Sequence, residues 1–482
     1  MLFHSLAYLY LFLPVTLGGF FVLGIGNRQK QQILWLIAAS LFFYAWWNPA
    51  YLALLLFSIG FNFGAFRMMQ RGWKRKKVLT LAITINLALL AYFKYANFFV
   101  HTLNKALGTN WVLESIVLPL AISFFTFQQI SFLVDAYRGE VDDVSFTEYC
   151  LYVSFFPQLI AGPIVRHHQM IPQFRSAVFG RINAHNVVMG MALIAMGLCK
   201  KIILADAMGN VVDPLYAEAL AGNPLSFSAA WIAAIGFGLQ IYFDFSGYTD
   251  MAIGSARLFS LRLPENFLSP YKSRSVQQFW QRWNVTLSSF LRDYLYIPLG
   301  GNRKGHVRTL LNLMVTMVLG GLWHGAGLLF LFWGGLHGLL LVLHYLWRKL
   351  KIQIPAPVAI FTTSACVMAL WVFFRAEVFS ASIPLYKGLL GMSSGSTVIS
   401  LQHMIFVAAS LFIVWFLPSS SWLVSRAENE MSMLQQKMFP PHFLRSLFFW
   451  GVGITMACLI AIVIFTVRLH GLKPVSFIYF QF

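Results

Sequence analysis

The stretch TLLNLMVTMVLGGLWHGAGLLFLFWGGLHGLLLVLHYLW, residues 309–347, decides the fold class of this chain. It holds 39 residues without one Asp, Glu, Lys or Arg, and Arg308 and Arg348 flank it. A single helix of this length would extend about 58 Å, roughly twice the hydrocarbon thickness of a bilayer. The stretch must therefore break, and its natural break is the glycine-rich run from Gly320 to Gly327.

The rest of the chain has the same membrane character. Of its 482 residues, 59% are hydrophobic and 11% are charged, whereas soluble globular chains carry about 25% charged residues. We therefore predict an all-α integral membrane protein with roughly 11 to 13 transmembrane or re-entrant helices around a central cavity. We expect one polytopic membrane domain over residues 1–482, in which Met1–Gly26 is a retained first helix. The other stretches that span, or nearly span, a bilayer are Tyr8–Gly26, Ile33–Trp47, Tyr51–Phe66, Val78–Phe93, Leu113–Val134, Val187–Leu198, Ala229–Phe243, Pro357–Phe374, Met404–Leu417 and Leu447–Val467.

The excess of basic residues does not indicate nucleic-acid binding. The formal net charge is +19, but Lys and Arg are dispersed in short loops such as residues 71–77 and 348–351. This is the bias expected of cytoplasmic loops in a membrane protein. The four cysteines are far apart and form no CxxC pair, so we expect neither a disulfide framework nor a zinc site.

Two stretches, residues 157–174 and 244–305, are too polar to face lipid throughout. Irregular polar backbone at membrane depth is tolerated only against protein or a water-filled cavity, so these stretches should line a cavity or lie at the interface. Within the second, Tyr271–Leu299 predicts an amphipathic helix. Its apolar residues recur every three and four positions beside a polar face that carries Gln278 and Arg282. The alternative interpretation is a plain interfacial anchor with a basic face.

His324 lies in the glycine-rich run, at least sixteen residues from either flanking arginine. An ionisable residue deep in a membrane is a functional-site hypothesis by default. An imidazole can take a proton from a hydroxyl that attacks an acyl carbon, and this chemistry needs no metal and no bound cofactor. The alternative is a histidine hydrogen-bonded to a neighbouring helix, which is the interpretation we prefer for His337 and His344. For the adjacent His167 and His168 we do not expect a shared metal.

Several motifs resemble a known family. The motif WHGA, residues 323–326, follows QFWQRWNVTLSSFLRDYLYIPLGGN, residues 278–302. Both resemble the membrane-bound O-acyltransferase family, and within it the subfamily of the alginate O-acetyltransferase membrane subunit. The resemblance spreads over roughly residues 124–375, which we expect to form the catalytic core. The other similar motifs are FPQLIAGPI (156–164), DFSGYTDMAIG (244–254), LPENF (263–267) and WVFFR (371–375).

The resemblance implies the site residues. His324 falls on the family's catalytic histidine, and Asn284 falls on a second position where many relatives carry histidine. Asparagine cannot act as a general base, but its amide can orient a substrate or donate to a developing oxyanion, so we expect a supporting role for Asn284. For Arg292 and Asp293 we favour a structural ion pair. The residues expected to line the cavity are Trp323, Gly325, Trp283, Arg282, Gln278, Arg292, Asp293 and Tyr294.

The resemblance also implies the substrates and the location. The expected donor is acetyl-CoA, approached from the cytoplasm, and the acetyl group would pass through the membrane core. A separate extracytoplasmic SGNH-type acetyltransferase partner would complete the transfer to a polysaccharide. The expected location is the bacterial cytoplasmic, or inner, membrane. The sequence does not distinguish alginate, cellulose, peptidoglycan and other exopolysaccharides as the polymer.

Two other functions fit parts of the same pattern. Proteins of this fold also help to add D-alanine to teichoic acids from a carrier-protein thioester, although residues 291–303 look more like the acetylation branch. A transporter would also use broken helices with polar residues at the midplane. No inverted internal repeat is visible in the sequence, and the polar motifs concentrate in one central block, which favours the acyltransferase.

Overall fold

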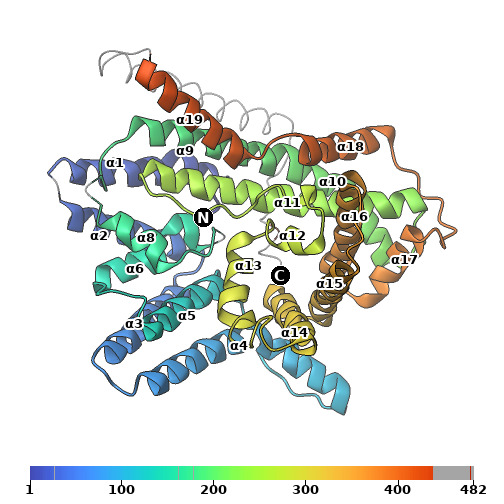
Figure 1. The fold of residues 1–482 in the computed structure, drawn as a ribbon, viewed down its shortest axis with the longest axis horizontal. Helices are drawn as coiled ribbons and strands as arrows, with labels where there is room; N and C mark the ends of the chain where they lie inside the picture. Colours follow the sequence, from blue (N-terminus) through green and yellow to red (C-terminus); the bar gives the residue numbers. More distant parts are fainter. Residues whose placement is uncertain (27, 115, 161, 177, 438–477, 479–482) are drawn as a thin grey trace. The chain divides into compact units, whose positions relative to one another are not determined.

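The computed structural model describes residues 1–437, except 27, 115, 161 and 177, and it also describes residue 478 (Figure 1). Within these residues the secondary structure is helical and contains no strand, which confirms the predicted all-α fold. One isolated antiparallel bridge joins Phe267 to Trp283. The predicted apolar stretch Leu447–Val467 lies outside the described residues.

The chain divides into two compact units, each made of segments that are distant in sequence. Unit 1 consists of Met1–Met196, Tyr248–Glu265 and Val424–Val463, and unit 2 consists of Gly197–Gly247, Asn266–Leu423 and Ile464–Phe482. Helices α11 (Phe227–Leu258) and α19 (Ser420–Lys437) have residues in both units. The single membrane domain stays a prediction.

Each of the remaining helices is assigned to the unit in which it begins. Those of unit 1 are η1 (Ala7–Phe12), α1 (Leu13–Gly24), α2 (Gln29–Ala45), α3 (Ala50–Gln70), α4 (Arg75–Leu107), α5 (Ile122–Arg138), α6 (Phe146–Ser154), α7 (Phe156–Leu159), α8 (His167–Phe174) and α9 (Ala184–Leu198). Those of unit 2 are the π-helical η2 (Cys199–Asp206), α10 (Ala207–Leu220), η3 (Pro270–Lys272), α12 (Val276–Trp280), α13 (Val285–Leu291), η4 (Arg292–Tyr296), α14 (His306–His324), α15 (Leu328–Trp347), η5 (Arg348–Leu350), α16 (Ala356–Arg375), α17 (Phe379–Leu389) and α18 (Leu401–Phe416).

Seven helices in the described part are long and apolar enough to cross a membrane. An eighth candidate is the pair α18 and α19, which bends by 46° between its two halves. The multi-pass membrane protein is thus confirmed. Some of the predicted stretches form helices that are too short to count among these spans; α2 and α5, for example, have 17 residues each. The seven spans are Ala7–Gly24, Ala50–Gln70, Arg75–Leu107, Ala184–Leu220, Phe227–Leu258, Leu328–Leu350 and Ala356–Arg375.

The charge-free stretch 309–347 breaks as predicted. α14 ends at His324, and α15 begins at Leu328 after an extended connection in which Gly325 has φ −163° and Gly327 has φ −166°. The two helices pack closely through glycines, since a Cβ on Gly321 would lie 2.9 Å from the Cα of Gly334. Clustered glycines therefore both end α14 and let α15 pack against it.

The single amphipathic helix predicted over Tyr271–Leu299 is wrong. The structure has four short helices there, and Asn284 interrupts them with a left-handed φ of 43°. The cause is a distant partner: Asn266 O accepts a hydrogen bond from Val285 N at 3.0 Å, and Leu268 N donates to Arg282 O at 2.9 Å. These contacts draw the chain out of helical geometry at this point. Five members of the predicted apolar stripe are nevertheless buried, with Phe279, Trp283, Leu287, Phe290 and Leu291 each at most 9% exposed, while the sixth, Tyr294, is partly exposed.

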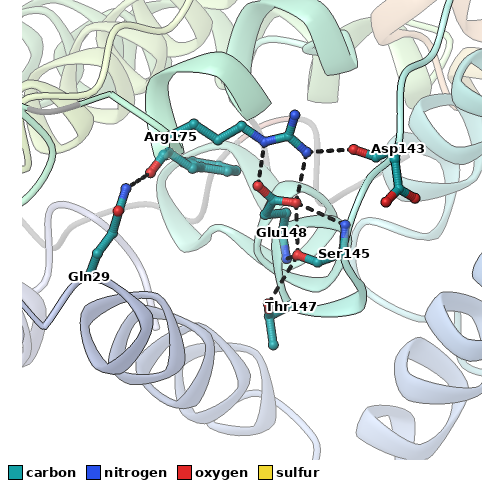
Figure 2. Close-up of polar contacts among 7 residues, drawn as sticks. Gln29, Asp143, Ser145, Thr147, Glu148 and Arg175 are labelled. Carbon is teal, nitrogen blue, oxygen red and sulfur yellow. Dashed lines mark hydrogen bonds and ion pairs between the residues drawn. The ribbon is translucent and has the colours of Figure 1, made fainter.

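Unit 1 contains a polar cluster outside the spans, centred on Glu148 (Figure 2). Ser145 is the N-cap of α6, and its backbone N donates to Glu148 Oε2 at 2.8 Å in a capping box. Arg175 donates to both carboxylate oxygens, from Nε to Oε1 at 2.5 Å and from Nη2 to Oε2 at 2.9 Å. This guanidinium holds the pKa of Glu148 at about 2, below its ordinary value of 4.5. The cluster joins α6 to the end of α8.

Candidate active site

His324 is the last residue of α14 and is only 4% exposed. Three aromatic rings contact its imidazole edge-on: Trp323 at 4.9 Å, Trp333 at 5.2 Å and Phe374 at 5.3 Å between ring centroids. The three rings belong to α14, α15 and α16. His324 therefore lies at a helix end inside an aromatic cage that shields it from solvent.

Gly325 makes this arrangement possible. A Cβ on Gly325 would lie 2.1 Å from Cε2 of Phe330, far inside van der Waals contact. The Phe330 ring in turn packs at 5.1 Å on Phe374, which contacts His324. The glycine next to the histidine is thus required by close packing.

A tryptophan cluster extends from His324 through unit 2. We use this name for Trp280, Trp283, Trp333 and Trp371. Trp333 lies 5.4 Å from Trp371 and 5.8 Å from Trp280, and Trp371 lies 5.0 Å from Trp283. Aromatic rings therefore form a continuous path from His324 to the residue that precedes Asn284.

Asn284 is buried at 2% exposure, at the turn between α12 and α13. Its left-handed backbone is a conformation in which asparagine is enriched over most residues. Its carbonyl accepts from Ser288 N at 2.9 Å, while its side-chain Nδ2 has no acceptor among the described residues. The side chain thus keeps a buried donor beside the tryptophan cluster.

The other predicted cavity residues divide into two groups. Trp323, Gly325 and Trp283 lie in the aromatic cage or the tryptophan cluster, as described above. The remaining five have contacts within residues 268–294. Gln278 Oε1 accepts from Arg274 N at 2.7 Å, Arg282 contributes its carbonyl to the bridge with Leu268, Arg292 pairs with Asp293 at 2.6 Å, and Tyr294 packs on Phe290 at 5.0 Å. The Arg292 side chain is 61% exposed, in agreement with a structural ion pair.

His337 and His344, which the sequence assigns to the core, differ in the structure. His337 is fully buried, and its Nδ1 accepts a hydrogen bond from Trp280 Nε1 at 3.3 Å. Its ring lies 4.7 Å from Trp333, so Trp333 contacts both His337 and His324. His344 is partly exposed near the end of α15.

Sequence reasoning missed a buried charge cluster in unit 2. Lys201 Nζ lies 2.8 Å from Asp206 Oδ1 and 2.6 Å from Asp244 Oδ1, and the three side chains are 1%, 8% and 1% exposed. Asp244 Oδ2 also accepts from Ile478 N at 2.7 Å. Two signals pointed here: a lysine inside an apolar span, and an aspartate that opens the motif at residues 244–254. Lys201 lies in the π-helical η2, a geometry that is frequent at functional sites.

The chemistry available at His324 is proton transfer. No group of three or more His, Cys, Asp or Glu side chains suitable for a metal occurs in the described part of the chain. The imidazole, the Asn284 amide and the indole N–H groups offer one base and several hydrogen-bond donors in a shielded setting. Such a set is suited to an acyl transfer in which a hydroxyl is deprotonated and a carbonyl becomes an oxyanion.

Comparisons with known proteins agree with this chemistry. The profile of the MBOAT, membrane-bound O-acyltransferase family, matches residues 72–379, which include both His324 and Asn284. The chain is 40% identical over 438 residues to the peptidoglycan O-acetyltransferase of Helicobacter pylori, covering 84% of this chain and 82% of that protein. It is 37% identical over 409 residues to the probable alginate O-acetylase AlgI of Pseudomonas aeruginosa, covering 82% and 76%. The teichoic acid D-alanyltransferase of Bacillus subtilis is 26% identical over 238 residues, covering 48% and 60%.

Proposed function

The chain belongs to the membrane-bound O-acyltransferase family and is a multi-pass membrane O-acyltransferase; from this premise we propose that it transfers an acetyl group from cytoplasmic acetyl-CoA toward an extracytoplasmic polysaccharide O-acetylation system, with His324 as the general base. The membrane would be the bacterial inner membrane. An SGNH-type acetyltransferase partner outside it would complete the transfer to the polymer.

The observation that carries the proposal is the setting of His324. It lies at the break between α14 and α15, 4% exposed and surrounded by Trp323, Trp333 and Phe374. An acyl thioester in such a setting is protected from wasteful hydrolysis, and electrostatic interactions within the site are strengthened.

The reaction proceeds through a tetrahedral intermediate. The acceptor hydroxyl attacks the thioester carbonyl carbon while His324 takes the hydroxyl proton, so a C–O bond forms and the carbonyl π electrons move to oxygen. Collapse of the intermediate breaks the C–S bond, and the histidinium returns its proton to the departing sulfur. We propose that the Asn284 amide orients a substrate or donates to the oxyanion.

The relatives favour acetyl over D-alanyl transfer. The O-acetyltransferase relatives named above are 37–40% identical over more than 80% of the chain, whereas the D-alanyltransferase matches at 26% over about half of it. Peptidoglycan and alginate appear in the names of the first group. The final acceptor we propose is therefore a glycan hydroxyl, which receives the acetyl group through the partner.

The test is acetyl transfer from radiolabelled acetyl-CoA by the full-length protein in detergent, with and without its partner. His324→Ala should lower turnover by about 10²- to 10⁴-fold, the usual contribution of a general base. The matched control is His403→Ala, since His403 is an exposed histidine on α18.

The outcomes separate the alternatives. Equal loss in both variants would indicate damage to the protein rather than loss of a base, and full activity in His324→Ala would refute the assigned role. If folded wild type used a D-alanyl carrier-protein thioester and not acetyl-CoA, the donor would be wrong while the acyltransferase chemistry would stand.

A further inference from the structure

Three buried N–H groups in and beside the tryptophan cluster have no hydrogen-bond acceptor among the described residues. They are Trp283 Nε1, Trp333 Nε1 and His337 Nε2. The three side chains are at most 1% exposed, so bulk water does not solvate them. The large majority of buried side-chain polar groups in native proteins have a partner, so three N–H groups without one in the same aromatic region need an explanation.

The histidine nitrogen is a donor like the two indoles. Trp280 Nε1 donates to His337 Nδ1 at 3.3 Å, so Nδ1 acts as the acceptor and the ring proton is on Nε2. An indole nitrogen can only donate. All three unsatisfied N–H groups are therefore donors that need an acceptor. A ligand that satisfies them carries oxygen lone pairs and not a positive charge.

Neighbouring rings in the same cluster satisfy their own N–H groups. Trp371 Nε1 donates to Tyr271 OH at 3.2 Å, and Tyr271 OH donates to Gly238 O at 2.6 Å. The packing of unit 2 can thus supply acceptors to buried indoles. Of the three rings with an unsatisfied N–H, Trp333 contacts His324 directly and His337 contacts Trp333.

The contacts place two of these donors, Trp333 and His337, beside the general base. Trp333 lies 5.2 Å from His324 and 4.7 Å from His337, so its ring joins the two histidines. Trp371 links Trp333 to Trp283 at 5.4 Å and 5.0 Å.

We propose that Trp333 and His337 donate hydrogen bonds to the carbonyl oxygen of an acyl thioester and to the oxyanion that forms when His324 deprotonates the acceptor. This inference rests on the proposed function and adds substrate-binding residues to it. Donors fixed in a shielded site stabilise charge as it develops on oxygen, which is usually a large contribution to catalysis.

The first test removes one N–H and keeps the ring. Trp333→Phe should lower kcat by about 10²-fold and raise KM less, by about tenfold, because the oxyanion gains more from the donor than the ground-state carbonyl does. Trp371→Phe is the matched control: it loses an N–H that is already satisfied by Tyr271 and should mainly lower thermal stability. Equal losses of kcat in the two variants would mean that the cluster only supports packing, and would overturn the proposal.

The second test uses two coenzyme A analogues and a conservative rescue. Trp333→Phe should weaken binding of a ketone analogue, which keeps the carbonyl, about tenfold, and should leave binding of S-ethyl-CoA, which lacks it, unchanged. His337→Phe should behave like Trp333→Phe, whereas His337→Gln should recover activity because its amide keeps a donor and an acceptor. Equal effects on both analogues would refute carbonyl binding. If wild type accepts only a D-alanyl carrier thioester, the same variants assayed with that donor test this inference separately from the choice of donor.

Discussion

Replacing Lys201 with Met should destabilise the protein by about 3–5 kcal/mol, the usual cost of removing one partner from a buried ion pair. Lys201 Nζ lies 2.8 Å from Asp206 and 2.6 Å from Asp244, so its loss leaves two carboxylates without this cation. The side chains of Asp206 and Asp244 are 8% and 1% exposed, so water cannot replace the lysine ammonium group. Met keeps an unbranched chain of similar length, so the packing of η2 changes little.

The assay is equilibrium unfolding in mixed detergent micelles, followed by circular dichroism while SDS is increased. The matched control is Asp213→Asn in the same unit, which breaks the Arg375–Asp213 pair of 3.2 Å. The Asp213 side chain is 56% exposed, and such a pair contributes at most about 1 kcal/mol.

The reasoning would be refuted if Lys201→Met lowered the free energy of unfolding no more than Asp213→Asn does. The double variant Lys201→Met with Asp244→Asn gives a further check. It removes the charge of one of the two carboxylates that have lost the lysine, so it should be more stable than Lys201→Met alone. If it is not, the loss comes from packing and not from charge.

Two further predictions concern stability. Glu148→Gln should lower the free energy of unfolding by about 1 kcal/mol at neutral pH. Folding lowers the pKa of Glu148 from 4.5 to about 2, so the ionised carboxylate stabilises the folded protein. The wild type should therefore keep its full extra stability above pH 4.5 and lose it as the pH falls toward 2. Unfolding of both proteins at pH 7, 4 and 2.5 measures this, and a pH-independent difference would contradict it. Gly334→Ala should cost about 1–3 kcal/mol relative to Gly335→Ala, since a Cβ on Gly334 would lie 2.4 Å from Met317 O whereas one on Gly335 has its nearest neighbour at 3.9 Å. Thermal unfolding in detergent compares the two, and equal stability would show that α14 and α15 separate without cost.

The break in the long apolar stretch could be predicted because its causes are local. The absence of charge over residues 309–347 fixes the membrane setting, and the glycines fix the place of the break. His324 follows as a candidate site from the cost of burying an ionisable group. The aromatic cage around it could not be predicted, because Phe374 arrives from another helix.

The two failures share a cause in long-range contacts. Asn284 interrupts the expected helix because Asn266 accepts a hydrogen bond from Val285, and no periodicity records that pairing. Lys201 lies in an apolar stretch, but its partner Asp244 is on α11, so the sequence alone does not pair the two. Patterns within one element predict that element, whereas partners from distant segments require the structure.

The position of Lys201 also has a consequence for biogenesis. A lysine at the centre of an isolated helix raises the free energy of inserting that helix into the membrane by about 2.5–3.5 kcal/mol. Asp206 lies in the same span and emerges from the ribosome almost together with Lys201, whereas Asp244 arrives only with the next span. Lys201 can therefore enter the bilayer already neutralised by Asp206, and Asp244 joins when α11 follows. Insertion of the span Ala184–Leu220 should depend on Asp206, whereas the stability of the folded protein should depend on both Asp206 and Asp244.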